Sequence, residues 1–187
     1  MRCCIGLPTN RPIKQRTVEC LLNLVVHSKH EFLIITATDG YTPSEKRNFI
    51  AVQAVNAKCD YIFFTDDDML FPPETLEVLL SREKDVTGAL YYQRVLPLRP
   101  VVELWEGQSM ADKLFKVKGV GLGLVLIKCS ILSKVKTPWF DTQVNEYGWT
   151  KLGDSYFFCD RVREAGFEVW CDPSLSIGHL SDYIYGL

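Results

Sequence analysis

The chain has 187 residues, 47% of them hydrophobic, which is enough for one domain with a full core and too few for a second independent one. The formal net charge is −2 and the pI about 5.9, with Lys and Arg scattered along the chain, so we expect no nucleic-acid partner. No apolar run is long enough for a transmembrane segment, and the one at residues 1–8 is too short for a signal peptide. A single domain over residues 1–187 is therefore expected.

The cysteines indicate a reducing compartment. There are 7 of them, an odd number without a CxxC pair, and most lie inside apolar runs. This pattern is typical of reduced core residues, so we expect a cytoplasmic protein.

The first half of the chain alternates strand and helix patterns. Apolar runs at residues 3–7 and 32–38 predict two strands, each followed by a turn or loop. The helix expected between them has its apolar stripe at Val18, Leu21, Leu22 and Val25. A strand, helix, strand, helix, strand order over about the first seventy residues predicts an α/β fold with a mostly parallel sheet.

A second helix is expected over residues 42–56. Residues 42–45 read Thr-Pro-Ser-Glu, a capping box with proline at the first helical position. Arg47 and Asn48 lie near the start of this helix and face either solvent or a ligand; the sequence pattern alone favours solvent for both.

Three consecutive carboxylates follow the third expected strand. Residues 61–64 read as a strand buried on both faces, which puts Asp66, Asp67 and Asp68 at its carboxyl end. Open α/β sheets bind ligands at that edge. Strand alternation places Asp66 and Asp68 on one side, where they could share a divalent ion such as Mg²⁺ or Mn²⁺ that neutralises otherwise uncompensated acids. The alternative is an acidic loop that precedes the next helix.

The second half is less regular. Residues 85–92 predict a strand, and residues 101–104 and 114–117 predict a hairpin. The glycine-rich residues 119–123 precede a strand at 124–127, whereas a dinucleotide fingerprint needs a helix there. We therefore expect these glycines to allow a close approach of the backbone to a ligand or to another strand.

The C-terminal part adds one helix and one strand. The helix is expected after Gly153 and ends at Gly166, and the strand at residues 167–171. By position alone Asp154 is an N-cap. His179 is the one histidine in the last run, where a structural role is the commoner one.

In order and spacing, these segments resemble the GT-A fold glycosyltransferases, particularly small family 2-like members of bacterial or phage type. Residues 66–68 resemble the DxD motif of that family, and Arg47-Asn48 the Arg-Asn pair on the preceding helix. Residues 121–123, with the aromatic cluster at 138–140, resemble its acceptor-side segment. Residues 153–159, followed by His179, resemble a C-terminal block in which an acidic motif precedes a helix and a distant histidine completes the metal site.

This resemblance implies a single GT-A (nucleotide-diphospho-sugar transferase) domain, an α/β/α sandwich around a mostly parallel sheet. The implied activity is metal-dependent transfer of a sugar from a nucleotide-diphosphate donor, with UDP as the expected nucleotide, to a hydroxyl acceptor on a glycan, lipid or protein. Mn²⁺ or Mg²⁺ would be bound by Asp66, Asp68 and His179, and histidine favours Mn²⁺. The donor site would contain Pro8, Thr9, Asp39, Arg47, Asp66 and Asp67. In an inverting enzyme Asp154 would be the catalytic base.

One departure from the family pattern bears on the base. Many relatives carry Glu-Asp where this chain reads Asp154-Ser155. Either Asp154 acts from one position earlier, the gap shifts by a residue, or the protein is retaining or inactive. A non-catalytic nucleotide-sugar-binding domain is thus an alternative. A sugar nucleotidyltransferase fits less well, since the first loop has only one glycine, and a dehalogenase-type phosphatase needs Thr or Val where Leu70 stands.

Overall fold

A seven-stranded sheet runs through the centre of the protein, in a computed structural model that describes residues 1–38, 42–181 and 184–185. Its strands lie in the order β2 (Glu31–Ala37), β1 (Arg2–Pro8), β3 (Tyr61–Thr65), β9 (Leu124–Lys128), β5 (Val86–Ala89), β12 (Val169–Asp172) and β7 (Phe115–Val117). Strands β9 and β7 run antiparallel to their neighbours, and the other strands are parallel to one another. The expected mostly parallel sheet is confirmed.

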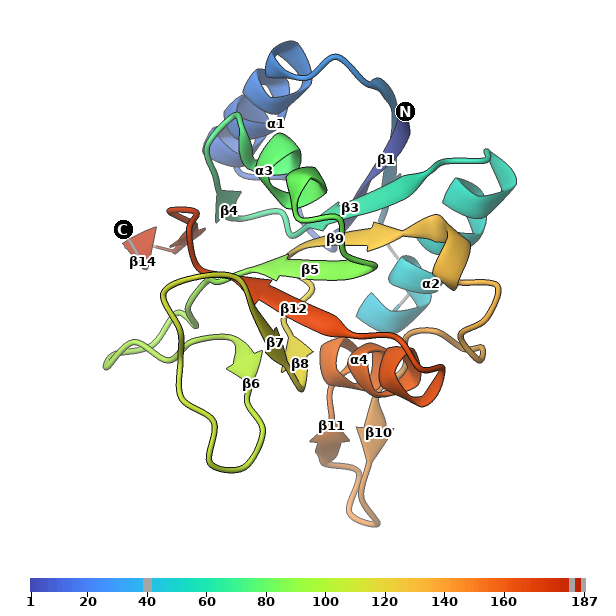
Figure 1. Cartoon of the computed structure of the whole chain (residues 1–187), viewed down its shortest axis with the longest axis vertical. Helices are drawn as coiled ribbons and strands as arrows, with labels where there is room; N and C mark the ends of the chain where they lie inside the picture. The colour runs from blue at the N-terminus through green and yellow to red at the C-terminus, as the bar shows by residue number, and fades with distance from the viewer. Residues whose placement is uncertain (39–41, 182–183, 186–187) are drawn as a thin grey trace.

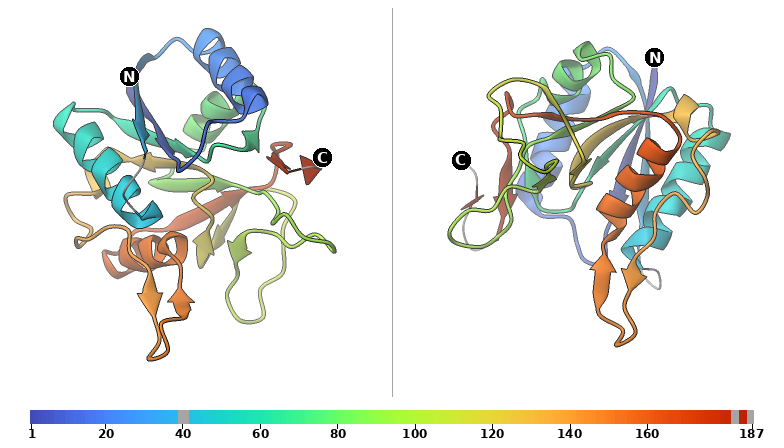
Figure 2. Two further views of the ribbon diagram at one scale, coloured as in Figure 1. Left: turned by 180° about the vertical axis from the view of Figure 1, so that it is seen from behind. Right: turned by 60° about the horizontal axis from the view of Figure 1, so that its bottom comes forward.

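Helices cover both faces of this sheet (Figures 1 and 2). Within the described residues the helices are α1 (Gln15–His27), α2 (Pro43–Asn56), α3 (Thr75–Ser81) and α4 (Asp154–Glu164). One core contains Leu24 of α1 and Leu76 of α3 with Phe63, and the other contains α2 and α4 residues with Phe64. Adjacent residues of β3 thus point into different cores, as in a strand buried on both faces. The structure is an α/β/α sandwich.

Smaller sheets surround the main one. Their strands are β4 (Met69–Leu70) with β13 (Gly178–Leu180) and β14 (Ile184–Tyr185), β6 (Val102–Glu103) with β8 (Gly119–Val120), and β10 (Gln143–Val144) with β11 (Thr150–Leu152). A 3₁₀ turn, η1 (Cys129–Ile131), follows β9. In the first of these sheets His179 pairs with Met69, and the Leu180 amide donates to the Asp68 carbonyl at 2.8 Å. This pairing brings the end of the chain to the three acids.

The buried face of α1 differs from the expected one. Thr17, Leu21 and Leu24 are buried, whereas Leu22 is 61% exposed and Val18 is also exposed. Leu21 and the partly buried Val25 pack in the core as expected, whereas the expectation for Val18 and Leu22 was wrong. A threonine occupies one position of the buried face, which a count of apolar residues alone does not reveal.

The hairpin expected between residues 101–104 and 114–117 was also wrong. Strand β6 pairs with β8, so that Val102 lies opposite Val120, while β7 pairs with the distant strand β12. The glycine-rich residues provide strand β8. Gly119 is required there because a Cβ atom at this position would lie 2.8 Å from the ring of Tyr156. The pairing of β7 with β12, a strand far along the chain, leaves no local sequence signal.

Several local expectations are confirmed. Thr42 and Glu45 form the capping box of α2, and Gly166 follows α4 with φ 84°. All seven cysteines are free thiols, and only Cys20 among them is not fully buried. Within the described ranges, every helix is too short or too polar to cross a bilayer.

Candidate functional site

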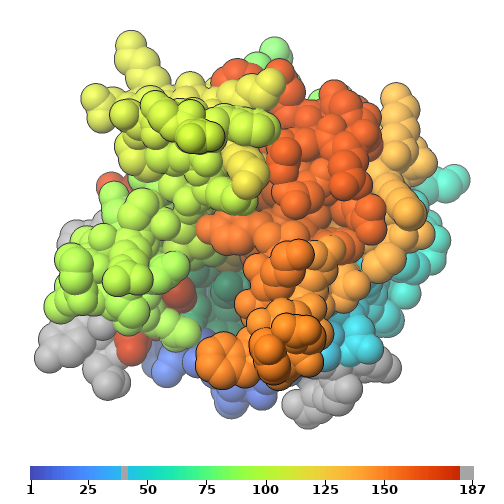
Figure 3. Space-filling model, turned by 90° about the horizontal axis from the view of Figure 1, so that it is seen from below, coloured from blue at the N-terminus to red at the C-terminus, as the bar shows by residue number. Residues whose placement is uncertain are grey.

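A cleft of about 530 Å³ opens where β1 and β3 end. Seen from below (Figure 3), a hollow lies between the light-green segment near residues 90–100 and the orange hairpin of β10 and β11. The cleft is lined by these residues of the expected site: Pro8, Thr9, Arg47, Asp66, Asp67, Asp68, Asp154 and His179. Asp39 lies outside the described residues. The topology therefore gathers residues from both ends of the chain at the sheet edge where ligands are expected.

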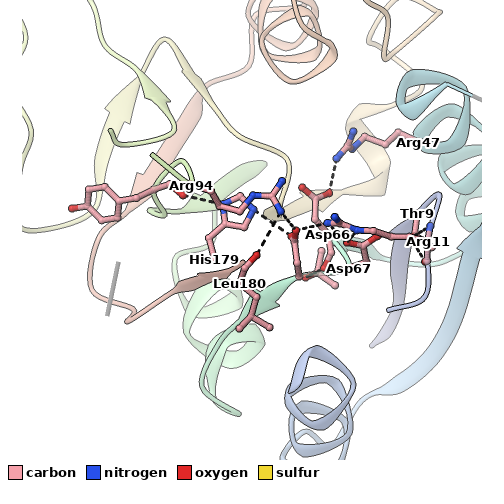
Figure 4. A network of polar contacts seen from close by, with 11 residues as sticks. Thr9, Arg11, Arg47, Asp66, Asp67, Arg94, His179 and Leu180 are labelled. Atoms are coloured by element: carbon pink, nitrogen blue, oxygen red, sulfur yellow. Dashed lines mark hydrogen bonds and ion pairs between the residues drawn. The ribbon is translucent and has the colours of Figure 1, made fainter. Parts of the chain in front are cut away.

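The three acids do not continue the alternation of β3. The strand ends at Thr65 and the acids turn into β4. Asp66 contacts Arg47 of α2, whereas Asp67 contacts Arg11 (Figure 4). Asp68 contacts Arg11 as well. The expected strand alternation was wrong because a turn replaces the extended backbone, but Asp66 and Asp68 still lie close enough for their charges to interact.

Arg47 joins the acids to α4. Its Nη2 lies 2.8 Å from Asp66 Oδ1 and its Nη1 2.5 Å from Asp154 Oδ2. Arg47 is only 5% exposed, so the solvent position favoured by the sequence pattern was wrong. Asp154 is not the N-cap either, since α4 is preceded by Gly153 at that position and Asp154 turns its side chain to Arg47. This ion pair joins residues 107 positions apart, which explains why local pattern missed it.

Two arginines that the sequence analysis did not single out neutralise the remaining acids. Arg11 donates from Nε and Nη2 to Asp67 Oδ1 at 2.9 and 2.7 Å, and its Nη2 also contacts Asp68. Arg94 Nη1 lies 2.7 Å from Asp68 Oδ2. The expectation of uncompensated acids was therefore wrong. Arg11 follows the first strand at the same sheet edge, a signal that could have found it, whereas Arg94 lies in an irregular segment.

The loop after β1 is also hydrogen-bonded to this cluster of acids and arginines. Thr9 Oγ1 hydrogen-bonds to the Asp67 carboxylate, and the buried Lys46 donates from Nζ to the Thr9 carbonyl at 2.6 Å. Lys46 also contacts the side-chain oxygen of Asn10. A second buried cation of α2 thus orders the backbone that lines the cleft.

His179 faces Asp68 from β13. Its Nδ1 lies 2.9 Å from the Tyr92 carbonyl, which can only accept, so Nδ1 carries a hydrogen. Its Nε2 lies 3.3 Å from Asp68 Oδ1. This nitrogen can therefore hold either a second proton or a lone pair directed at a cation, the usual arrangement of a metal-binding histidine.

The pKa values of two of the acids shift in opposite directions. Burial would raise the pKa of Asp68, but the hydrogen bond and charge of His179, with the charges of Arg94 and Arg11, outweigh it and lower this pKa. For Asp66 burial dominates and raises the pKa in spite of Arg47. Asp68 is the more firmly ionised of the two and thus the better cation ligand.

The residues fit a divalent cation that shares its coordination with a ligand. Asp68 and His179 present adjacent oxygen and nitrogen donors. Asp66 lies close enough to interact electrostatically with both. Over the described ranges, no three His, Cys, Asp or Glu side chains are spaced to hold a metal by themselves. Further donors would have to come from water or from a phosphate, as is usual for Mg²⁺.

The glycine-rich bend forms the wall behind the acids, which confirms the expected close approach of its backbone. The Asp66 amide donates to the Gly123 carbonyl at 3.0 Å, and the Gly123 amide donates to the Tyr91 hydroxyl at 3.1 Å. A Cβ atom on Gly123 would lie 2.7 Å from Tyr91 Oη and 2.9 Å from Asp66 Oδ2. Only glycine leaves both groups in place.

Comparisons with known proteins show similarity in structure. No protein-family model matches the chain, and no curated protein is similar to it in sequence. The crystal structure of A197 from STIV has a TM-score of 0.69 and 21% identity, over 97% of this chain and 87% of that one. GalNAc-T7, crystallised with UDP, GalNAc and Mn²⁺, has a TM-score of 0.57 and 10% identity, over 96% of this chain and 44% of that one. The fold is GT-A-like.

A further GT-A glycosyltransferase shares the architecture. S. aureus TarS in complex with UDP-GlcNAc has a TM-score of 0.53 and 14% identity, over 99% of this chain. This chain spans 44% of GalNAc-T7 and 57% of that TarS chain, so it corresponds to only part of each. The likeness concerns the fold, and the chemistry of the cleft has to be argued from its own residues.

Proposed function

We propose that this chain is a metal-dependent glycosyltransferase that moves a sugar from a nucleotide-diphosphate donor, UDP-sugar first, to a hydroxyl acceptor. The observation that supports it most is the convergence of Asp68, His179 and Asp154 on one cleft at the ligand-binding edge of a GT-A-like fold. A cation-binding pair and a separate carboxylate are the two components that such a transfer needs.

The donor would lie across the ends of β1 and β3. Pro8 and Thr9 would flank the nucleoside, and Asp66 and Asp67 would lie toward the ribose and the diphosphate. Asp39 would complete the nucleoside side. Lys46 and Asp67 fix Thr9 from two directions, so this part of the cleft is preorganised rather than formed on binding.

Asp68 and His179, with Asp66 beside them, would hold Mn²⁺ or Mg²⁺. When bound, the cation stabilises the negative charge of the departing nucleoside diphosphate. The Tyr92 carbonyl keeps the hydrogen of His179 on Nδ1, which leaves Nε2 free to act as a ligand.

Asp154 would act as the base of an inverting transfer. The acceptor oxygen forms a bond to the anomeric carbon, the bond from that carbon to the phosphate oxygen breaks with its electrons going to the diphosphate, and Asp154 takes the acceptor proton. Arg47 contacts one oxygen of Asp154, Oδ2, and orients the carboxylate toward the cleft. Ser155, whose hydroxyl accepts from the Leu122 amide at 3.4 Å, is too weakly basic to replace a carboxylate as the base.

Nucleotide release from a panel of nucleotide sugars, with Mn²⁺ present, tests this proposal. We expect at least one donor to be hydrolysed slowly without an acceptor. Asp154→Asn should lower the rate by about 10²- to 10⁴-fold while donor binding measured by calorimetry stays nearly intact. Asp68→Ala should abolish the metal-dependent part of UDP binding.

Two results would contradict it. Turnover retained in Asp154→Asn would move the base to another group, and undiminished binding in Asp68→Ala would remove the metal assignment. Donor binding without hydrolysis of any panel member would favour the non-catalytic nucleotide-sugar-binding domain, which the Ser155 departure makes the second candidate.

A further inference from the structure

Arg11 and Arg94 contact the carboxylates that a cation and a diphosphate would also address. Arg94 Nη1 lies 2.7 Å from Asp68 Oδ2, and Arg11 bridges Asp67 and Asp68. Asp68 Oδ1 faces His179, so both oxygens of this carboxylate have a positively charged or protonatable neighbour. A cation that binds Asp68 has to compete with these guanidinium groups.

Both arginines lie at the mouth of the cleft, above the acids. The side chains of Arg11 and Arg94 are 46% and 38% exposed, whereas those of Asp67 and Asp68 are 8% and 2% exposed. Apart from a long contact to the Leu180 carbonyl at 3.5 Å, Arg94 uses only Nη1, and only for Asp68. Its other guanidinium nitrogens make no hydrogen bond within the described residues. They are available to a ligand that enters from solvent.

The charges of the cleft nearly cancel before any ligand binds. Among the described residues, its lining contains four carboxylates, the three of the turn and Asp154, against the guanidinium groups of Arg11, Arg47 and Arg94. A divalent cation alone would therefore enter a site most of whose negative charge is already neutralised. A diphosphate would bring the negative charge that draws exposed guanidinium groups away from carboxylates, since Arg binds phosphate with paired hydrogen bonds.

We propose that Arg11 and Arg94 are exchangeable counter-ions: in the free protein they neutralise Asp67 and Asp68, and on donor binding they move to the diphosphate and release Asp68 to the cation. This inference rests on the proposed function for the identity of the ligand. It makes cation and diphosphate mutually dependent: the factor by which bound diphosphate raises the affinity for the cation equals the factor by which the bound cation raises the affinity for the diphosphate.

Arg47 cannot take part in this exchange. Its side chain is 6% exposed and is held by Asp66 and Asp154 together. Leaving two carboxylates without their shared partner costs far more than moving a half-exposed arginine. The exchange is therefore limited to the two arginines at the mouth.

Manganese binding with and without UDP tests the exchange. The signal of free Mn²⁺ in electron paramagnetic resonance reports binding directly and requires no turnover. For the wild type we expect Mn²⁺ to bind at least about tenfold more tightly when UDP is present. Arg94→Gln should have effects of opposite sign: Mn²⁺ alone binds about five- to tenfold more tightly, and UDP in the presence of Mn²⁺ binds more weakly by a similar factor.

Arg11→Gln is a second variant, at the other arginine that contacts Asp68. Like Arg94→Gln, it should strengthen the binding of Mn²⁺ alone and weaken the binding of UDP in the presence of Mn²⁺. The matched control is Lys116→Gln, which removes a surface partner of Glu168 far along the sheet and should change neither affinity. Circular dichroism of each variant shows whether it is folded.

The possible failures are distinguishable. Equal Mn²⁺ affinity of the wild type with and without UDP, or a loss of both affinities in folded Arg94→Gln and Arg11→Gln, would overturn the exchange while leaving the glycosyltransferase proposal intact. Failure of the wild type to bind UDP with Mn²⁺ present would overturn both.

Discussion

The cleft contains two kinds of arginine–carboxylate contact, and they differ in burial. The buried side chain of Arg47 extends from α2 to Asp154 of α4 and also contacts Asp66. Arg11 and Arg94 instead contact Asp67 and Asp68 from the solvent side. The buried contact is structural and positions the proposed base. The half-exposed contacts neutralise acids that the proposed ligands would need. Similar distances in a structure can therefore correspond to a fixed pair and to an exchangeable one.

The largest expected effect comes from removing the buried partner. Arg47→Met removes the buried guanidinium group that pairs with the carboxylates of both Asp66 and Asp154, and we expect a loss of about 3 kcal/mol in the free energy of unfolding. Urea denaturation at pH 7 measures it. Lys116→Met, which breaks an exposed pair, is the matched control and should cost less than about 1 kcal/mol. Equal losses in the two variants would contradict the distinction drawn from burial.

An intermediate effect is expected at Asp172, a fully buried carboxylate outside the cleft. Burial would raise its pKa, but hydrogen bonds from Ser174 and the contact with Arg82, 2.6 Å away, outweigh it and lower this pKa. The stability from this group is then present above the unfolded pKa of about 3.9 and is lost as the pH falls through the lower folded value.

Asp172→Asn should therefore reduce the free energy of unfolding at pH 7 by about 1–3 kcal/mol and make the loss of stability on acidification smaller. Denaturation curves at pH 7, 5 and 3.5 measure both effects. If the free energy of unfolding of Asp172→Asn falls as steeply with decreasing pH as that of the wild type, other carboxylates, Asp68 first among them, cause the loss of stability in acid.

The smallest effect on stability is expected at the mouth of the cleft. Arg94→Gln removes a half-exposed charge, so the change in the free energy of unfolding should stay within about 1 kcal/mol. Thermal unfolding measures it, and Arg47→Met under the same conditions sets the scale. A loss as large as that of Arg47→Met would make Arg94 a structural residue and would weaken the case for exchange.

The sequence predicts the sheet and the acids better than the partners of those acids. Strand β3 and the capping box of α2 have strong local signals, an apolar run and a Thr-Pro-Ser-Glu motif. The resemblance in motif order brought Asp154 and His179 into the expected site, and the structure places both in the cleft. Contacts between segments far apart in the chain have no such signal: the local pattern favoured solvent for Arg47, which only the resemblance placed in the site, and Arg94 lies in a segment without periodicity.

The same reason accounts for the errors in the peripheral parts. The partner of β7 is a strand some fifty residues further along the chain, β12, which no turn signal between neighbouring strands can reveal. On α1 a buried threonine shifts the packed face away from the apolar count. Local patterns thus located the elements, and tertiary contacts decided what each one faces.

The most direct test of the distinction between fixed and exchangeable arginines follows their side chains during ligand binding. The Nε–Hε resonances of ¹⁵N-labelled protein can be assigned with the Arg11→Gln, Arg47→Met and Arg94→Gln variants and titrated with UDP and diamagnetic Mg²⁺. We predict that the signals of Arg11 and Arg94 shift on addition of UDP with Mg²⁺, while that of Arg47 stays in place. Shifts at Arg47 with unchanged signals at Arg11 and Arg94 would contradict the account.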